Sequence, residues 1–129
     1  MVYQYITEMI RRPHMVSRER GFAGTLLRHW GVTRETTVDA VLIALSELLS
    51  NAVLYGKADA IVLSLSYSRN EVLVEVDDRT PGTWPARARP TEHDEGGRGL
   101  LLVEALSSAF DVSDDGSMAW CVIPAGQVT

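Results

Sequence analysis

The chain has 129 residues, and we expect it to form a single domain over residues 1–129. Apolar residues make up 46% and charged residues 22%, a globular balance that excludes a disordered, collagenous or low-complexity chain. The net charge is −5, and the part from residue 71 onward carries −7. Direct binding to nucleic acid needs a clustered basic surface, so we expect no nucleic-acid partner.

The single cysteine, Cys121, excludes an internal disulfide and a multi-cysteine zinc site. No stretch reaches the ~18 consecutive apolar residues of a membrane span. The N-terminus has no apolar segment followed by a small-residue cleavage site. We therefore expect a cytoplasmic protein with no membrane partner.

The first elements along the chain are a short strand and a helix. Weak alternation predicts a strand over 5–10, which Pro13 ends. Ser17 is expected to cap a helix over 18–30, because apolar residues recur there at helical spacing. Gly31 stands where a C-terminal cap is expected.

The most regular pattern belongs to a second helix. It starts at Thr36 or Thr37, carries a broad apolar stripe and ends before Gly56. Residues 60–67 and 72–77 then alternate with a period of two around a short polar turn. We expect these two segments to be adjacent antiparallel strands.

The segment 79–97 has prolines, glycine and charges but no periodicity, which predicts a long loop. A loop of this length in a compact domain is typical of a lid or binding segment. A helix over 98–106 follows it. Strands over 110–113 and 118–123, joined by an Asp-Asp-Gly turn, close the chain as a hairpin.

Four polar residues of the second helix form one narrow stripe, expected on the face away from the core: Ser46, Glu47, Ser50 and Asn51. One interpretation is a short solvated stripe. The other is a carboxylate and an amide that face a cavity, where the amide oxygen can bind a hard cation and the carboxylate can orient or deprotonate a nucleophile. No basic residue lies on this helix to pair with the carboxylate, but spacing alone leaves both interpretations open.

Two carboxylates, Asp77 and Asp78, end the strand that precedes the long loop. Such a pair is commonly only a turn signal. Asp78, however, continues the face of the alternating valines of this strand, whereas Asp77 points to the other face. A buried carboxylate at Asp78 needs a donor, and the amino group of a planar ring would supply one.

The sequence Gly96-Gly97-Arg98-Gly99 directly precedes the third helix. A glycine-rich turn at a helix N-terminus gathers free backbone amides and the positive end of the helix dipole, which favours an anion. By itself this motif is weak. It matches neither the phosphate-binding Walker sequence nor the dinucleotide-binding fingerprint.

In this order the fragments resemble a known family. Glu47-Leu-Leu-Ser-Asn51, then Val-Glu-Val-Asp-Asp78 with Gly82, then a lid and Gly97-Arg-Gly-Leu100 are similar to the GHKL (Bergerat-fold) ATP-binding domains. The resemblance covers about residues 15–123, and the short chain with GGRGLLLVEAL is most similar to the anti-sigma factor serine kinases. It implies an α+β fold, with an antiparallel mixed sheet and helices packed on one face.

The resemblance also implies roles in binding ATP and Mg²⁺. Asn51 becomes the magnesium ligand and Glu47 the catalytic base or water-orienting carboxylate. Asp78 becomes the residue that reads adenine, and Gly82 lets the chain pass under the base. The phosphate-facing turn is assigned to the remaining residues of the motif, namely Gly97, Arg98, Gly99 and Leu100.

Two positions depart from the family pattern. The motif D-x-G-x-G reads Asp78-Arg-Thr-Pro-Gly82, so Thr80 replaces a glycine and its backbone must avoid the glycine-only regions. The last strand of the family offers a threonine hydroxyl that supports the adenine-reading aspartate, and here we expect Met118 at that position. Loss of one such hydrogen bond, about 0.5–1.5 kcal/mol, would weaken ATP binding roughly two- to tenfold.

The resemblance implies a serine/threonine protein kinase that binds Mg-ATP and either sequesters a sigma factor or phosphorylates an antagonist protein. The alternative is a non-catalytic partner-switching module with the same fold, which Thr80 and Met118 favour. A sensor histidine kinase core is a lesser alternative, because its dimerisation helix would not fit into 129 residues. A homodimer is compatible with each of these.

Overall fold

The computed structural model describes residues 1–84 and 95–126, with 95–98 as backbone only. It contains eight elements within these ranges, in the predicted order. They are β1 (Tyr3–Ile10), α1 (Pro13–His29), α2 (Glu35–Tyr55), β2 (Ala60–Ser68), β3 (Glu71–Asp77), α3 (Glu95–Leu106), β4 (Ala109–Val112) and β5 (Met118–Pro124). Much of the predicted lid, residues 85–94, lies outside the described part.

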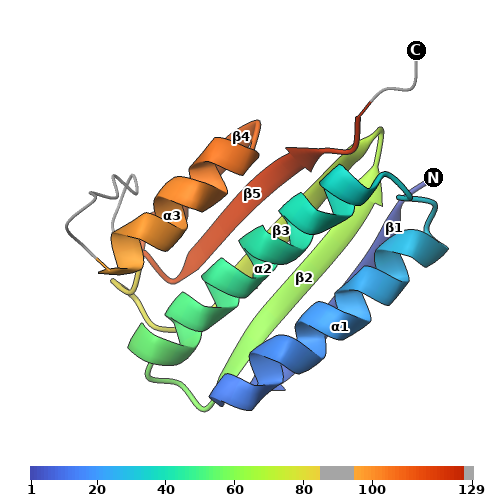
Figure 1. Cartoon of the computed structure of the whole chain (residues 1–129). Coiled ribbons are helices and arrows are strands. Elements are labelled where there is room, and N and C mark those ends of the chain that lie inside the picture. Colours follow the sequence, from blue (N-terminus) through green and yellow to red (C-terminus); the bar gives the residue numbers. More distant parts are fainter. Residues whose placement is uncertain (85–94, 127–129) are drawn as a thin grey trace.

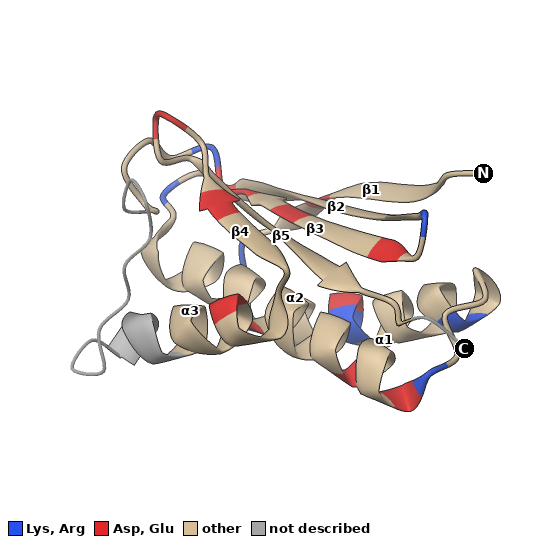
Figure 2. Ribbon diagram, turned by 90° about the horizontal axis from the view of Figure 1, so that it is seen from above, with Lys and Arg blue, Asp and Glu red and all other residues tan. Residues whose placement is uncertain are grey.

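The strands form one sheet in the order β1-β2-β3-β5-β4, and each of its four pairings is antiparallel. All three helices lie on one face of this sheet, as Figures 1 and 2 show. The expected α+β fold with helices on one face is therefore confirmed. The described strands include no parallel pair, so the sheet is antiparallel and not mixed.

The core lies between α2 and the inner face of the sheet. In Figure 1 α2 runs between α1 and α3. Its buried side chains meet those of β3 and β5, where every second residue is buried. By length and composition α2 could also span a membrane, a test that the core helix of a folded domain passes as well. The buried face of α2 beneath the sheet accounts for its hydropathy here.

The helix α1 begins earlier than the sequence predicted. Pro13 lies in its first turn, where a missing N–H costs nothing, so this proline starts the helix and does not separate it from the strand. Arg12, in an extended conformation, is the N-cap residue, and the expected cap at Ser17 is wrong. Gly31 does follow the helix in the left-handed region, with φ 97°.

The helix α3 also begins earlier than expected, at Glu95, and the predicted loop therefore ends before Gly97. Gly96, Gly97 and Gly99 lie inside the helix and not in a turn before it. Glycine costs roughly 1 kcal/mol relative to alanine in a helix interior. The burial of apolar side chains further along α3, such as Val103, offsets this cost.

Candidate functional site

Asp78 lies directly after β3 and is completely buried. The alternating valines of β3 are buried on the same face, as the sequence predicted, whereas Asp77 is half-buried on the other face. The backbone N–H of Asp78 donates to the carbonyl of Ser117 at 3.0 Å, which continues the pairing of β3 with β5 beyond the strand. The position of Asp78 is therefore fixed by the sheet.

One oxygen of the Asp78 carboxylate has a partner and the other has none. The Oδ1 atom accepts the backbone N–H of Thr80 at 2.9 Å. The Oδ2 atom is buried and has no hydrogen-bond partner among the described residues. The hydroxyl of Thr83, which lies near the carboxyl, donates instead to the Thr80 carbonyl at 3.0 Å. Burial raises the pKa of Asp78, and the hydrogen bond from Thr80 offsets this only in part.

An unpaired buried carboxylate oxygen is costly to the folded protein and is a strong acceptor for a donor on a ligand. The exocyclic amino group of adenine is a donor of this kind. The structure thus fits the adenine-reading role that the resemblance implies for Asp78.

The loop after Asp78 is tied to the turn that joins β4 and β5. Gly82 has φ 85°, a conformation that side chains rarely adopt, and its N–H donates to the Asp115 carbonyl at 2.9 Å. Two residues later the N–H of Trp84 donates to Gly116 at 2.9 Å. The backbone at residue 82, in the loop next to Asp78, is therefore in the left-handed region that favours glycine.

Sequence reasoning missed Trp84. Only 2% of this side chain is exposed, and its Nε1–H is buried without a partner among the described residues. A lone tryptophan between prolines was a usable signal, because loops seldom carry so large an apolar side chain unless it is packed.

The expected position of Met118 is wrong. Met118 pairs with Asp77, so Ser117 is the residue across from Asp78. The Ser117 hydroxyl donates to Asp115 at 2.7 Å, within the turn. A hydroxyl-bearing residue is thus present opposite Asp78, although its bond is directed to Asp115.

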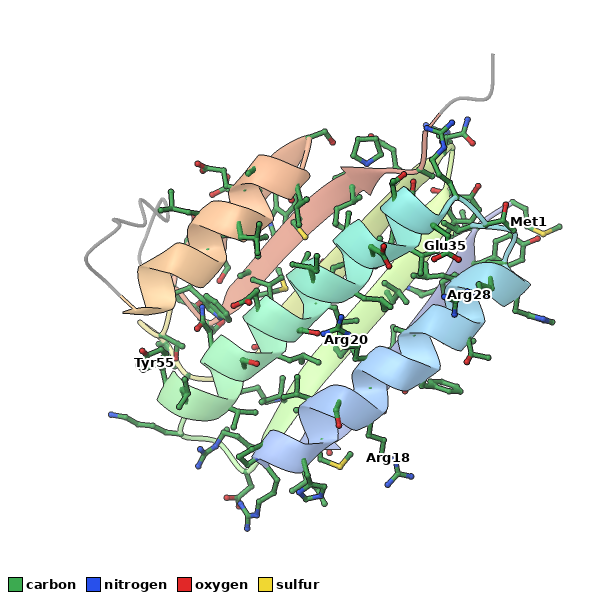
Figure 3. All side chains as sticks on the ribbon, viewed as in Figure 1. Met1, Arg18, Arg20, Arg28, Glu35 and Tyr55 are labelled. Carbon is green, nitrogen blue, oxygen red and sulfur yellow. The ribbon has the colours of Figure 1, made fainter. Side chains whose placement is uncertain are left out.

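The polar stripe of α2 is divided between two environments, so the single face predicted for its four residues is wrong. Ser46 and Ser50 line a groove of about 470 Å³ against the first turns of α1. Arg20 of α1 lines the same groove, and Figure 3 shows it between the two helices. Glu47 and Asn51 lie about 100° further round the helix, away from this groove.

Asn51 is only 7% exposed. It is one residue before Ala52, whose carbonyl accepts the N–H of Gly56 at 2.9 Å where α2 ends. A Cβ atom on Gly56 would lie 3.3 Å from the Asp78 Cβ atom, so this end of α2 packs directly against Asp78. The Asn51 amide, in the last two turns of α2 before this contact, offers the kind of oxygen that a hard cation such as Mg²⁺ binds.

Glu47, one turn before Asn51 on α2, is half-buried against α3. A Cβ atom on Gly99 would overlap the Glu47 Oε2 atom. The Glu47 carboxylate would therefore have to move if residue 99 carried a side chain. No group of three or more His, Cys, Asp or Glu residues gathers in the described part of the chain.

The phosphate-facing turn needs correction. In a helix that begins at Glu95, only the first four N–H groups lack a partner within the helix. The amides of Gly99 and Leu100 lie beyond them and are committed to the helix, and the Leu100 side chain is buried in the core. Gly97 and Arg98 lie in the first turn, where the helix dipole favours an anion.

Comparison with known proteins identifies the family of the chain as a whole. No curated protein matches the chain. The family model for the histidine kinase-like ATPase domain, an ATP-binding domain of the GHKL type, matches residues 11–123, which begin directly after β1 and include every later element except the last residue of β5. The chain therefore belongs to the histidine kinase-like ATPase domain family.

Proposed function

We propose that this domain binds Mg-ATP, with adenine at Asp78, Mg²⁺ at Asn51 and the phosphates at the start of α3. The observation that carries the proposal is the buried Asp78 Oδ2 atom without a partner. Gly82 next to it and Gly97 and Arg98 in the first turn of α3 complete the set of contacts. The family match supports nucleotide binding independently of these contacts.

We further propose that the domain is a serine/threonine protein kinase of the anti-sigma type. Its partners would be a sigma factor, which it sequesters, or an antagonist protein, which it phosphorylates. Glu47 is the one carboxylate on α2 placed one turn from Asn51, so it would take the proton from the attacking hydroxyl. Bound Mg²⁺ would supply charge neutralisation on the phosphates.

A non-catalytic partner-switching module is the second candidate. The contact between Glu47 and Gly99 favours it, because a carboxylate packed against a helix is not free to face a substrate. Thr80 in the adenine loop does not favour it, since its φ is outside the positive range and no strain results. The two candidates therefore differ at Glu47, and both keep nucleotide binding.

A homodimer would be formed by pairing two β1 strands. β1 is an edge strand of eight residues, and no described strand pairs with its outer side. Cys121 is buried, which raises the pKa of its thiol to about 11, so it will not interfere with an introduced cysteine. A Thr7→Cys variant should cross-link to itself if the strands pair near their centre.

We propose the cytoplasm as the location, because α2, long and apolar enough to span a membrane, is here the core helix.

The test is calorimetry with ATP and MgCl₂, followed by incubation of the protein with labelled ATP and a panel of candidate antagonist proteins. We expect saturable heat and transfer of label to a serine or threonine. No heat at millimolar nucleotide would refute the binding proposal. Heat without transfer to any antagonist would leave the non-catalytic module as the function.

A further inference from the structure

Thr80 lies two residues after Asp78, at a position where the family pattern has a glycine. The residue with left-handed conformation directly after Asp78 is Arg79, with φ 55°, and Thr80 does not have a positive φ. Residue 80 can therefore carry a side chain without backbone strain. The family pattern has a glycine here, so this chain has gained a hydroxyl and a methyl group at the position.

The Thr80 hydroxyl joins two segments that are far apart in the sequence. It accepts the backbone N–H of Lys57 at 2.9 Å, just after the end of α2, and donates to the carbonyl of Asp78 at 3.1 Å. The loop after α2 is thus bonded to the turn after β3. A glycine at residue 80 could make neither bond, because both use the hydroxyl oxygen.

These bonds determine how the Asp78 carboxylate is presented. The N–H of Thr80 occupies Oδ1 at 2.9 Å and leaves Oδ2 without a partner among the described residues. Next to Lys57, a Cβ atom on Gly56 would lie 3.4 Å from Oδ2, so the end of α2 borders the free oxygen. The hydroxyl therefore keeps the turn, the carboxylate and the end of α2 in one arrangement.

We propose that Thr80 is a positioning residue, which fixes the Asp78 carboxylate so that Oδ2 faces the 6-amino group of a bound adenine. This inference rests on the proposed binding of adenine at Asp78. Its consequence is selectivity for the base: the Thr80 hydroxyl contributes to the preference for a purine that carries a 6-amino group, although both of its hydrogen bonds are to the protein backbone.

The test compares ATP with purine riboside 5′-triphosphate, which lacks the 6-amino group, by calorimetry on the full chain with MgCl₂. Thr80→Val keeps the shape of the side chain and removes the hydroxyl, and we expect about five- to tenfold weaker ATP binding from a misdirected carboxylate. Binding of the analogue should stay within twofold, so the ratio of the two affinities falls. Thr80→Ser keeps the hydroxyl and should restore the wild-type ratio.

The matched control is Thr37→Val, at the opposite end of α2. Thr37 is buried, whereas Thr80 is half-buried, and the Thr37 hydroxyl likewise donates to a backbone carbonyl, that of Ala125, at 3.2 Å. Loss of this bond should lower the melting temperature but leave the ratio of the two nucleotide affinities unchanged, because the Thr37 hydroxyl has only a structural role. If wild type itself does not distinguish the two nucleotides, adenine recognition at Asp78 is wrong. If wild type distinguishes them and Thr80→Val retains the full ratio, the positioning role of Thr80 is wrong.

Discussion

The Cα atom of Gly99 in α3 faces the Glu47 carboxylate of α2 so closely that a methyl group at residue 99 would overlap Oε2. The two helices pack together along this line. The absence of a side chain at residue 99 therefore allows α3 to cover the carboxylate proposed to act in catalysis. Gly99, to which the family resemblance assigns a role in binding phosphates, therefore also has a packing role.

Gly99→Ala should reveal this contact as a coupling between the two residues. Alanine is favoured over glycine inside a helix by roughly 1 kcal/mol, but the Glu47 carboxylate must move aside for the new methyl group, so the gain in stability should be smaller than this. In a Glu47→Ala background the same change should stabilise the protein by about 1 kcal/mol. Urea unfolding of the four proteins measures the coupling. Equal effects of Gly99→Ala in both backgrounds would contradict the contact.

Glu47 and Asn51 should separate transfer from binding. Glu47→Ala should leave the affinity for Mg-ATP within about threefold of wild type and abolish transfer, because a proton acceptor acts on the transition state. Asn51→Ala should weaken Mg-ATP binding as well, since a metal ligand acts in both states. Calorimetry and a label-transfer assay with the antagonist protein measure the two effects. Full transfer by Glu47→Ala would mean that another residue orients the nucleophile.

The sequence was sufficient to predict that Asp78 is buried, because the signal for this burial is local. The alternation of β3 carries the buried face one step past the strand, and burial of Asp78 follows. Helical spacing was less informative on α2. Residues one position apart differ by only 100°, so spacing did not separate the groove-lining Ser46 and Ser50 from Glu47 and Asn51.

The remaining errors arise from tertiary packing. Three glycines in four residues predict a turn, yet α3 continues through them because its later side chains are buried in the core. The sequence predicts Met118 opposite Asp78, where the structure has Ser117. This error has a similar origin. The residue opposite Asp78 is set by the register between β3 and β5, which are separated in the chain by α3 and β4 and not joined by a hairpin turn, so no local sequence signal specifies it.

Asp78→Asn should weaken the binding of ATP and ADP at least tenfold. The variant replaces one carboxylate oxygen with an amide and loses a charge-assisted bond in a buried site. Asp77→Asn is the matched control, since it removes the same charge from the half-buried neighbour on the other face of the sheet. Its effect on calorimetric affinity should stay below twofold. Similar losses for both variants would show that the register of this strand end has been misjudged.

The same substitution should stabilise the nucleotide-free protein at neutral pH. Burial raises the pKa of Asp78 above its value in the unfolded chain, so the folded state holds this proton more tightly. The free energy of unfolding contributed by Asp78 is therefore lower above the folded pKa, where the buried carboxylate is charged. It recovers as the pH falls through the folded pKa toward the unfolded value near 3.8.

Asp78→Asn removes this ionisation, and the two proteins should consequently differ most at pH 7. Urea unfolding at pH 7 should show the variant to be more stable than wild type, and the difference should shrink steadily as the pH is lowered toward 4. Comparing the two proteins at each pH cancels the titration of all other groups. A difference that grows on acidification would mean that the folded protein stabilises the charged form of Asp78. Oδ2 would then be paired within the protein, and it would no longer be available to the 6-amino group of adenine.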